Sequence, residues 1–203
     1  MFKGFKVLSV IAVLAISAFT LSSCTFIFQK GRKSDADKIR ELKTKVSALG
    51  QAKNELDSRL SREIADKQVK VEMLERGLVI TFVSEVLFDS GKAKLRSEAL
   101  RAIDQVAGVL TTTVSDLNVG IEGHTDNVAI KHSGWKSNWE LSSARALSVL
   151  EYLEKEGQVQ SRRLSATGFG EHHPVSSNDS REGRQKNRRV EIVILPKAEK
   201  KGR

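Results

Sequence analysis

An acid and a base, Asp126 and Arg145, are placed in this sequence where they can act on one ligand. Asp126 follows residues 117–122, whose Leu, Val and Ile alternate with polar or small residues, a pattern typical of a half-buried strand. Apolar residues at steps of three across 141–153 predict a helix that begins near residues 137–138. We therefore expect Asp126 where a strand leaves the sheet, and Arg145 about two turns inside the next helix.

The pair suggests recognition of a zwitterion, a group with an amine and an acid on one carbon. A carboxylate such as Asp126 can hold an ammonium group, and the Arg145 guanidinium can hold a carboxylate with two parallel hydrogen bonds. Strand ends and the first turns of the following helix are favoured ligand positions in sheets flanked by helices. A mutual salt bridge that pins the loop to the helix is the alternative, and spacing alone does not separate the two.

Four sequence blocks in one order resemble the OmpA-like peptidoglycan-binding domain, which OmpA, Pal and MotB share. The blocks are GHTDN, NWELSSARALSVLEYL, RLSATGFGEHHPV and GRQKNRRVEIVIL. The resemblance covers roughly residues 77–196, and the insert at residues 128–136 is similar to the MotB-type variant.

The resemblance implies a ligand, the diaminopimelate residue of the peptidoglycan stem peptide, and a set of contact residues. The acid of the TD pair corresponds to Asp126, the arginine of the LSxxRA block to Arg145, and the first arginine of the NRR triplet to Arg188. The same family pattern places further contacts around them, at Thr125, Asn127, Leu141, Asp89, Ser90 and Gly91. Some members carry Asn where this chain has Gly91, so only backbone can contact the ligand there.

Composition favours an anionic partner without naming it. The 203 residues carry a formal net charge of +9, which suits nucleic acid, a membrane surface or an anionic wall polymer. Aromatic residues make up only 5% of the chain, which argues against a stacking platform for single-stranded nucleic acid. We expect no nucleic-acid partner, because the chain begins like an exported protein.

Residues 1–23 have the features of a lipoprotein signal peptide, with a basic start, a short apolar run and small residues before Cys24. The ending Leu-Ser-Ser-Cys resembles a bacterial lipobox, so Cys24, the single cysteine, is the expected lipidation site. Residues 24–33 would then be a lipid-anchored linker on the periplasmic face of the outer membrane. The alternative is an uncleaved inner-membrane helix, since Val7 to Gln29 carries no charge. That alternative corresponds to a MotB-like stator subunit.

Residues 34–76 are predicted to form a helical spacer, running from about Ser34 to Glu75. A heptad-like seam starts at Ile39, so the spacer is either a coiled coil that makes a homodimer or a lone solvated helix. Residues 197–203 form a basic tail that we expect to be disordered.

The pattern of the ligand-binding domain, residues 77–196, predicts an α/β fold of the α+β sandwich type. Two long helices are expected on one face of a small mixed sheet in the order βαβαβ(α)β. The predicted elements are strand 78–88, helix 95–113, strand 117–122, helix 137–156, strand 163–168, a helical turn at 180–186 and strand 189–195.

Other chemistries are less favoured by the sequence. The four histidines, at 124, 132, 172 and 173, lack the ligand spacing of a zinc site, so no metal or cofactor is expected. No serine lies in a nucleophile-elbow pattern, so we do not expect an enzyme. The run REGRQKNRR, with five basic residues and one acid, is an alternative polyanion-binding site. Envelope proteins are further possible partners.

Overall fold

The computed structural model describes residues 35–131 and 133–195 of the chain. The predicted signal peptide 1–23, the lipidation site Cys24, the linker 24–33 and the basic tail 197–203 lie outside the described residues, as does the histidine at position 132. Among the helices that are described, none combines the length and the apolar character needed to cross a membrane.

The chain divides into two units, residues 1–46 and 47–203. In the first unit, the described residues 35–46 are helical and expose Ile39, Leu42 and Val46 to solvent. These side chains belong to the predicted coiled-coil seam, and the homodimer remains a prediction. The second unit begins with helical residues 47–59 and the short helix α2 (Ser61–Ala65).

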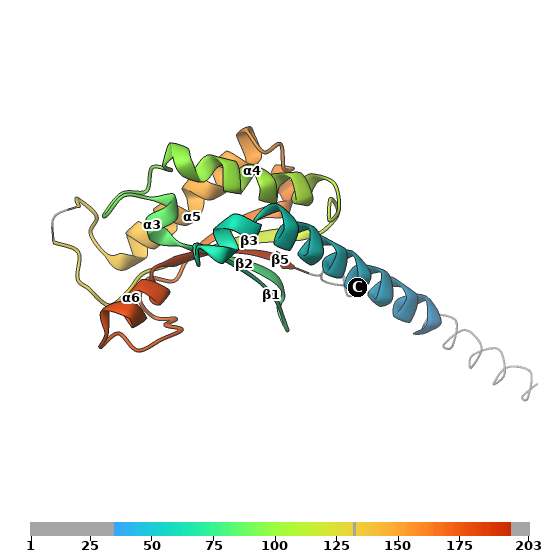
Figure 1. Ribbon diagram of the computed structural model, residues 1–203, viewed down its shortest axis with the longest axis horizontal. Helices are drawn as coiled ribbons and strands as arrows, with labels where there is room; N and C mark the ends of the chain where they lie inside the picture. The colour runs from blue at the N-terminus through green and yellow to red at the C-terminus, as the bar shows by residue number, and fades with distance from the viewer. Residues whose placement is uncertain (1–34, 132, 196–203) are drawn as a thin grey trace, which may run out of the picture. The chain divides into compact units, whose positions relative to one another are not determined.

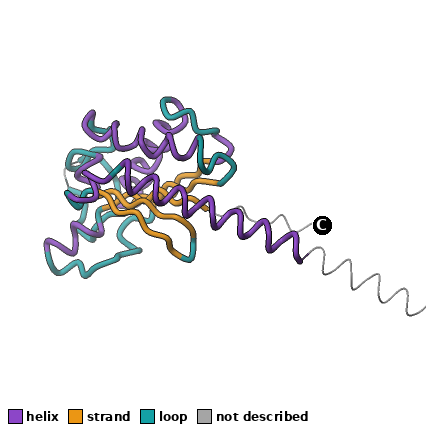
Figure 2. The backbone as a smooth tube through the Cα atoms, turned by 45° about the vertical axis from the view of Figure 1, so that its right-hand side comes forward, coloured by secondary structure: helices purple, strands orange, loops and turns teal. Residues whose placement is uncertain are grey.

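The described residues of the second unit form one mixed sheet of five strands, ordered β1-β2-β5-β3-β4. Figures 1 and 2 show these strands gathered into a single layer. Only β3 and β4 pair in parallel, and the other neighbouring strands are antiparallel. The strands are β1 (Val69–Leu74), β2 (Gly77–Val83), β3 (Asn118–His124), β4 (Leu164–Gly168) and β5 (Arg189–Leu195).

Two long helices, α4 (Ser97–Thr111) and α5 (Asn138–Lys155), lie on one face of this sheet (Figure 1). Alternate residues of the strands enter the core beneath the helices, among them Ile80, Ile121 and Ile192. A 3₁₀ turn, η1 (Ser161–Arg163), precedes β4, and α6 (Arg181–Asn187) precedes β5. The predicted fold class, with two long helices on a small mixed sheet, is confirmed.

The predicted helical spacer over residues 34–76 is wrong in its last part, after residue 65. The helix that ends at residue 59 is followed by α2, and the chain then forms β1, which pairs with β2 through a tight turn at Glu75 and Arg76. The physical reason is a change of period: Val69 and Val71 alternate with Lys70 and Glu72, and the two valines are buried in the core. The core of the folded domain therefore includes residues well before 77.

The second correction concerns the end of the first predicted strand. Residues Ser84–Leu87 form the short helix α3 instead of continuing β2. The backbone N–H of Phe88 donates to the carbonyl of Ser84 at 2.9 Å, which closes the turn, while the N–H of Ser84 donates to the carbonyl of Arg188 at 3.0 Å. Burial of Leu87 and Phe88 in the core holds the turn in place.

Close backbone approach fixes α5 against β3. A Cβ placed on Gly123 would lie 2.1 Å from the carbonyl oxygen of Ser142, so only glycine permits this contact. The helix begins where the Ser137 hydroxyl accepts a hydrogen bond from the N–H of Glu140, at 3.3 Å. The end of β3, which leads to Asp126, and the first turns of α5, which carry Arg145, are thus held side by side.

Candidate functional site

A pocket of about 520 Å³ lies where β3 ends, beside the first two turns of α5. Its lining comes from α3, the loop after Phe88, the loop after β3, α5 and the residue before β5. The lining residues are Ser84, Glu85, Phe88, Ser90, Gly91, Lys92, Thr125, Asp126, Val128, Ala129, Ile130, Ser133, Asn138, Leu141, Arg145 and Arg188. Its volume lies within the range of small-molecule sites and leaves room for an amino-acid side chain or a short peptide segment.

Asp126 lies at the inner wall of this pocket, with only 10% of its side chain exposed. One carboxylate oxygen, Oδ1, accepts the backbone N–H of Val128 at 3.1 Å, which makes a turn just after the strand. The other, Oδ2, accepts Nη1 of Arg188 at 2.6 Å. Asp126 therefore pairs with Arg188, and not with Arg145 as the salt-bridge alternative from the sequence required.

Arg145 extends from α5 into the same pocket and is only 5% exposed. Its Nε donates to the carbonyl of Lys92 at 2.9 Å, and its guanidinium carbon lies 5.2 Å from the centre of the Phe88 ring. Burial lowers the pKa of Arg145, an effect that the charges of Glu85 and Asp126 oppose. A buried guanidinium that uses one of its five N–H groups inside the protein has four left for a ligand.

Arg188 is held between two acids. Besides the bond to Asp126, its Nε donates to Oε1 of Glu85 at 2.7 Å, and its Nη2 also pairs with that oxygen. Burial lowers the pKa of Arg188, but the hydrogen bonds to Asp126 and Glu85 outweigh it, so the pKa lies above its ordinary value. The positive charge of Arg188 is therefore already matched within the pocket.

Two buried hydroxyl groups in the pocket wall have no hydrogen-bond partner among the described residues. They are Oγ of Ser84 and Oγ1 of Thr125, on residues that are 2% and 5% exposed. Buried polar atoms are rarely left unpaired, since each costs about 1–3 kcal/mol. A bound polar ligand is one way in which both hydroxyls would be satisfied.

Most of the residues suggested by the family resemblance come together here. Seven of them line the pocket: Thr125, Asp126, Leu141, Arg145, Arg188, Ser90 and Gly91. Asn127 and Asp89 are not in the lining, and Asp89 accepts Nη1 of Arg96 at 3.2 Å instead. Gly91 has a φ of 65°, and its carbonyl accepts the indole N–H of Trp135 at 2.9 Å, so its backbone supports the insert after Asp126.

Sequence reasoning missed the contribution of α3, because Ser84 and Glu85 fall where a strand was expected to continue. The pairing of Glu85 with Arg188 joins residues 103 positions apart, a separation at which no local pattern gives a signal. Among the tryptophans, Trp135 packs on the Gly91 loop, whereas Trp139 is 49% exposed and stacks on His172 with ring centres 4.8 Å apart.

The basic run near the C-terminus is largely used inside the domain. Nη1 of Arg184 donates to the carbonyl of Asn178 at 2.6 Å, and Nε of Arg189 donates to Oε1 of Glu191 at 2.6 Å. Since Arg188 also binds acids within the pocket, the run does not present a row of free guanidinium groups. This weakens the polyanion-binding alternative.

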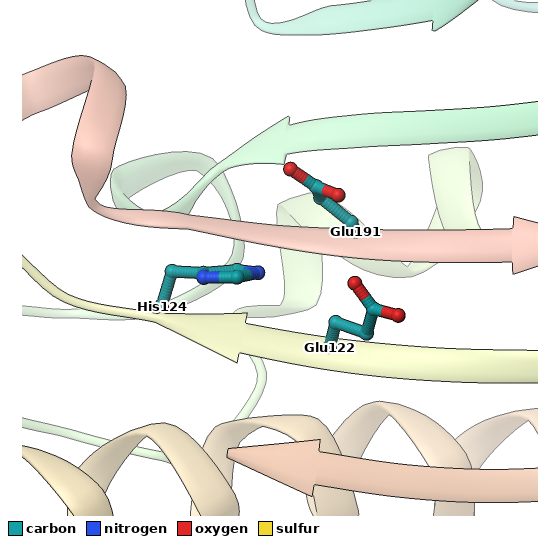
Figure 3. A group of neighbouring side chains, drawn as sticks. All are labelled: Glu122, His124 and Glu191. Atoms are coloured by element: carbon teal, nitrogen blue, oxygen red, sulfur yellow. The ribbon is translucent and has the colours of Figure 1, made fainter. Parts of the chain in front are cut away.

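A second polar cluster lies on adjacent strands β3 and β5, where Glu122, His124 and Glu191 point toward one another (Figure 3). Their ligand atoms are within 4.8 Å of one another, close enough to hold a metal ion. Arg76 already bridges both carboxylates, with Nη1 at 2.5 Å from Glu122, and Arg189 binds the other carboxylate oxygen of Glu191. Two guanidinium groups thus balance the two acids, and a cation would have to displace one of them.

His124 supports the loop that carries Asp126. Its ring stacks on Phe169 with centres 5.1 Å apart, and the Phe169 N–H donates to the carbonyl of Gly123 at 2.9 Å. Both ring nitrogens are buried and unpartnered among the described residues. Burial, aided by the charge of Arg189, lowers the pKa of His124 from 6.5 to about 3, so the ring is neutral at physiological pH.

The comparisons with known proteins assign the family. The model of the OmpA family matches residues 87–188, half of the chain, and the chain belongs to that family. Motility protein B of Bacillus subtilis is 38% identical over 149 residues, which are 73% of this chain. The chain spans 57% of the length of that relative.

Two solved structures share the fold. The cell wall anchor of the T6SS from Pseudomonas aeruginosa superposes with a TM-score of 0.63 at 34% identity, covering 70% of this chain and 97% of that one. A MotB-like protein from Desulfovibrio vulgaris superposes with a TM-score of 0.68 at 30% identity, covering 78% of this chain and 97% of that one. The predicted resemblance to the OmpA-like domain is confirmed.

Proposed function

We propose that the chain binds peptidoglycan without catalysing a reaction, by holding the zwitterionic end of diaminopimelate in the pocket beside α5. The observation that carries this proposal is the arrangement of charges: a buried acid, Asp126, and a buried guanidinium, Arg145, face one pocket without bonding to each other. A group with an ammonium and a carboxylate on one carbon matches that arrangement.

In the proposed complex, the ligand carboxylate binds the free N–H groups of Arg145. The ligand ammonium binds Asp126, which it shares with Arg188. Oδ1 and Oδ2 of Asp126 each accept one bond in the structure, and each keeps a further lone pair for the ammonium. The unpartnered hydroxyl of Thr125 offers one more polar contact. Each charge-assisted bond contributes about 1.5–3 kcal/mol.

The direct test is retention of the detergent-solubilised full chain on purified sacculi. We expect Asp126→Ala and Arg145→Ala each to lower retention on diaminopimelate-containing sacculi at least about tenfold. Sacculi that carry lysine in place of diaminopimelate lack the side-chain carboxylate, so they should retain the unmodified chain weakly. Unchanged retention of both variants on diaminopimelate sacculi would refute the assignment of the pocket.

We further propose that the chain is an outer-membrane lipoprotein, acylated at Cys24 after removal of residues 1–23, with the linker 24–33 leading to the wall-binding domain. The support for this proposal is the sequence pattern that ends at Cys24, the single cysteine. Such a protein would tether the outer membrane to the wall. Homodimerisation through the exposed seam at Ile39, Leu42 and Val46 belongs to the same proposal, as does contact with other envelope proteins.

A second candidate is a MotB-like subunit anchored in the inner membrane, which the 38% identity to motility protein B favours. The two candidates predict different results in palmitate labelling and in membrane fractionation. A lipoprotein incorporates labelled palmitate, loses the label in Cys24→Ser, and fractionates with the outer membrane. A stator-like subunit remains unlabelled and fractionates with the inner membrane, and that result would decide for the second candidate.

A further inference from the structure

The acid Glu85 lies at the wall of the ligand pocket, outside the segment that defines the family. It belongs to α3, whose first three residues precede the matched residues 87–188. Its carboxylate binds Arg188 through Oε1, with the Nε distance at 2.7 Å. Because 46% of the Glu85 side chain is exposed, a ligand entering the pocket can reach it.

The charges of the buried or ion-paired side chains that line the pocket balance only when Glu85 is included. Asp126 contributes one negative charge, while Arg145 and Arg188 contribute two positive charges, so these three residues alone leave an excess of +1. Such a pocket would attract a plain anion and repel an ammonium. Glu85 brings the sum to zero. Lys92 also lines the pocket, but its exposed side chain forms no ion pair with the described residues, so solvent screens its charge more than that of Glu85, which is bonded to Arg188.

Glu85 also favours binding of the ligand ammonium beside Arg188. Arg188 lies between the two acids, bonded to Asp126 at 2.6 Å and to Glu85 at 2.7 Å. An ammonium that binds Asp126 must therefore approach the Arg188 guanidinium, and Glu85 offsets the repulsion between the two cations. The neighbouring Ser84 hydroxyl, buried and without a partner among the described residues, offers an acceptor on the same wall.

We propose that Glu85 sets the selectivity of this pocket, favouring a ligand that carries an ammonium and a carboxylate together over one that carries the carboxylate alone. The inference rests on the proposed function, because it concerns the same pocket. It names a specificity residue that lies outside the family match and that the sequence patterns did not identify.

The experiment compares two soluble ligands on the detergent-solubilised full chain by calorimetry. One is a stem peptide with free diaminopimelate, and the other is the same peptide with its side-chain amine acetylated. The variants are Glu85→Gln and Glu85→Lys. The matched control is Glu151→Gln, which makes the same charge change on α5, where Glu151 pairs with Lys155 at 3.1 Å.

We expect the unmodified chain to prefer the free peptide, and Glu85→Gln to reduce that preference at least about threefold. Glu85→Lys should reverse the preference, with tighter binding of the acetylated peptide, while Glu151→Gln should match the unmodified chain. Using two variants keeps the test valid if one of them fails to fold.

The outcomes separate the two proposals. If the unmodified chain binds neither peptide, the proposed function fails and this inference fails with it. If the unmodified chain binds the free peptide but every folded Glu85 variant keeps the same ratio of affinities, the inference alone is overturned. A ratio of one in the unmodified chain would also overturn it.

Discussion

Replacing Arg145 by methionine should separate ligand binding from stability. The side chain is buried, yet among the described residues only its Nε bonds to the protein, at 2.9 Å from the Lys92 carbonyl. Losing that bond costs about 1.5–3 kcal/mol, but removing a desolvated charge offsets a similar amount, as the lowered pKa of Arg145 indicates. Methionine can still pack on the Phe88 ring. We therefore expect the free energy of unfolding to change by no more than about 1 kcal/mol.

Ligand binding should respond very differently to the same substitution. If Arg145 holds the ligand carboxylate, Arg145→Met loses about 1.5–3 kcal/mol of binding free energy, which is roughly tenfold to 150-fold in affinity. The assay is calorimetric titration with the diaminopimelate peptide, alongside thermal unfolding of the same sample. Unchanged ligand affinity together with a large loss of stability in Arg145→Met would contradict this prediction.

Arg163 provides the matched control, because it is a second buried arginine with a purely internal role. It donates to the carbonyls of Leu110, Val114 and Leu117 at 2.8, 2.7 and 2.6 Å. Arg163→Met should lower the free energy of unfolding by at least about 3 kcal/mol while leaving ligand affinity unchanged. If Arg145→Met destabilises as much as Arg163→Met and still binds, Arg145 is a structural residue and the reasoning is wrong.

Three further predictions concern the fold. Because burial lowers the pKa of His124 from 6.5 to about 3, the unfolded chain binds a proton between these pH values that the folded chain does not. The free energy of unfolding should therefore fall as the pH drops from about 6.5 to 3, by up to about 1.4 kcal/mol per pH unit. His124→Phe should flatten this slope in urea titrations. Gly123→Ala places a Cβ 2.1 Å from a carbonyl oxygen of α5 and should destabilise the fold by more than about 2 kcal/mol in thermal unfolding. Gly50 is a helical position with nothing within 4 Å of an added Cβ, so Gly50→Ala should stabilise the fold by up to about 1 kcal/mol in the same assay. A fragment of residues 77–203 lacks β1 and the buried side chains before it, so it should unfold at a lower denaturant concentration than residues 35–203. Equal unfolding midpoints would show that residues before 77 do not contribute to the core.

Local patterns were sufficient for the elements that place the two central residues. The alternation before Gly123 predicted β3, and the three-residue steps after Ser137 predicted α5, so the positions of Asp126 and Arg145 at a strand exit and on the next helix followed from periodicity. The secondary-structure predictions that failed lie where the period of the apolar residues changes within a few positions. Val69 and Val71 form a strand inside a charged stretch that otherwise reads as helical, because their partners in β2 stabilise it.

The site itself required long-range contacts. Sequence spacing left open whether Asp126 binds Arg145 or faces it across a gap, since both arrangements use the same residues. The choice depends on Arg188, which comes 62 positions after Asp126 and 103 after Glu85, and which binds both acids. No local propensity encodes such a pairing, because it exists only once β5 lies between β2 and β3.

The amino-acid sequence by itself thus determined the family, the periodicity of the main elements and the identity of an acid and a base suited to a zwitterion. Only the tertiary structure decided which charges pair with one another and which remain available to a ligand. The physical reason is that periodicity reports which side of an element is buried, whereas the partner of a buried charge depends on the packing of segments far apart in the chain.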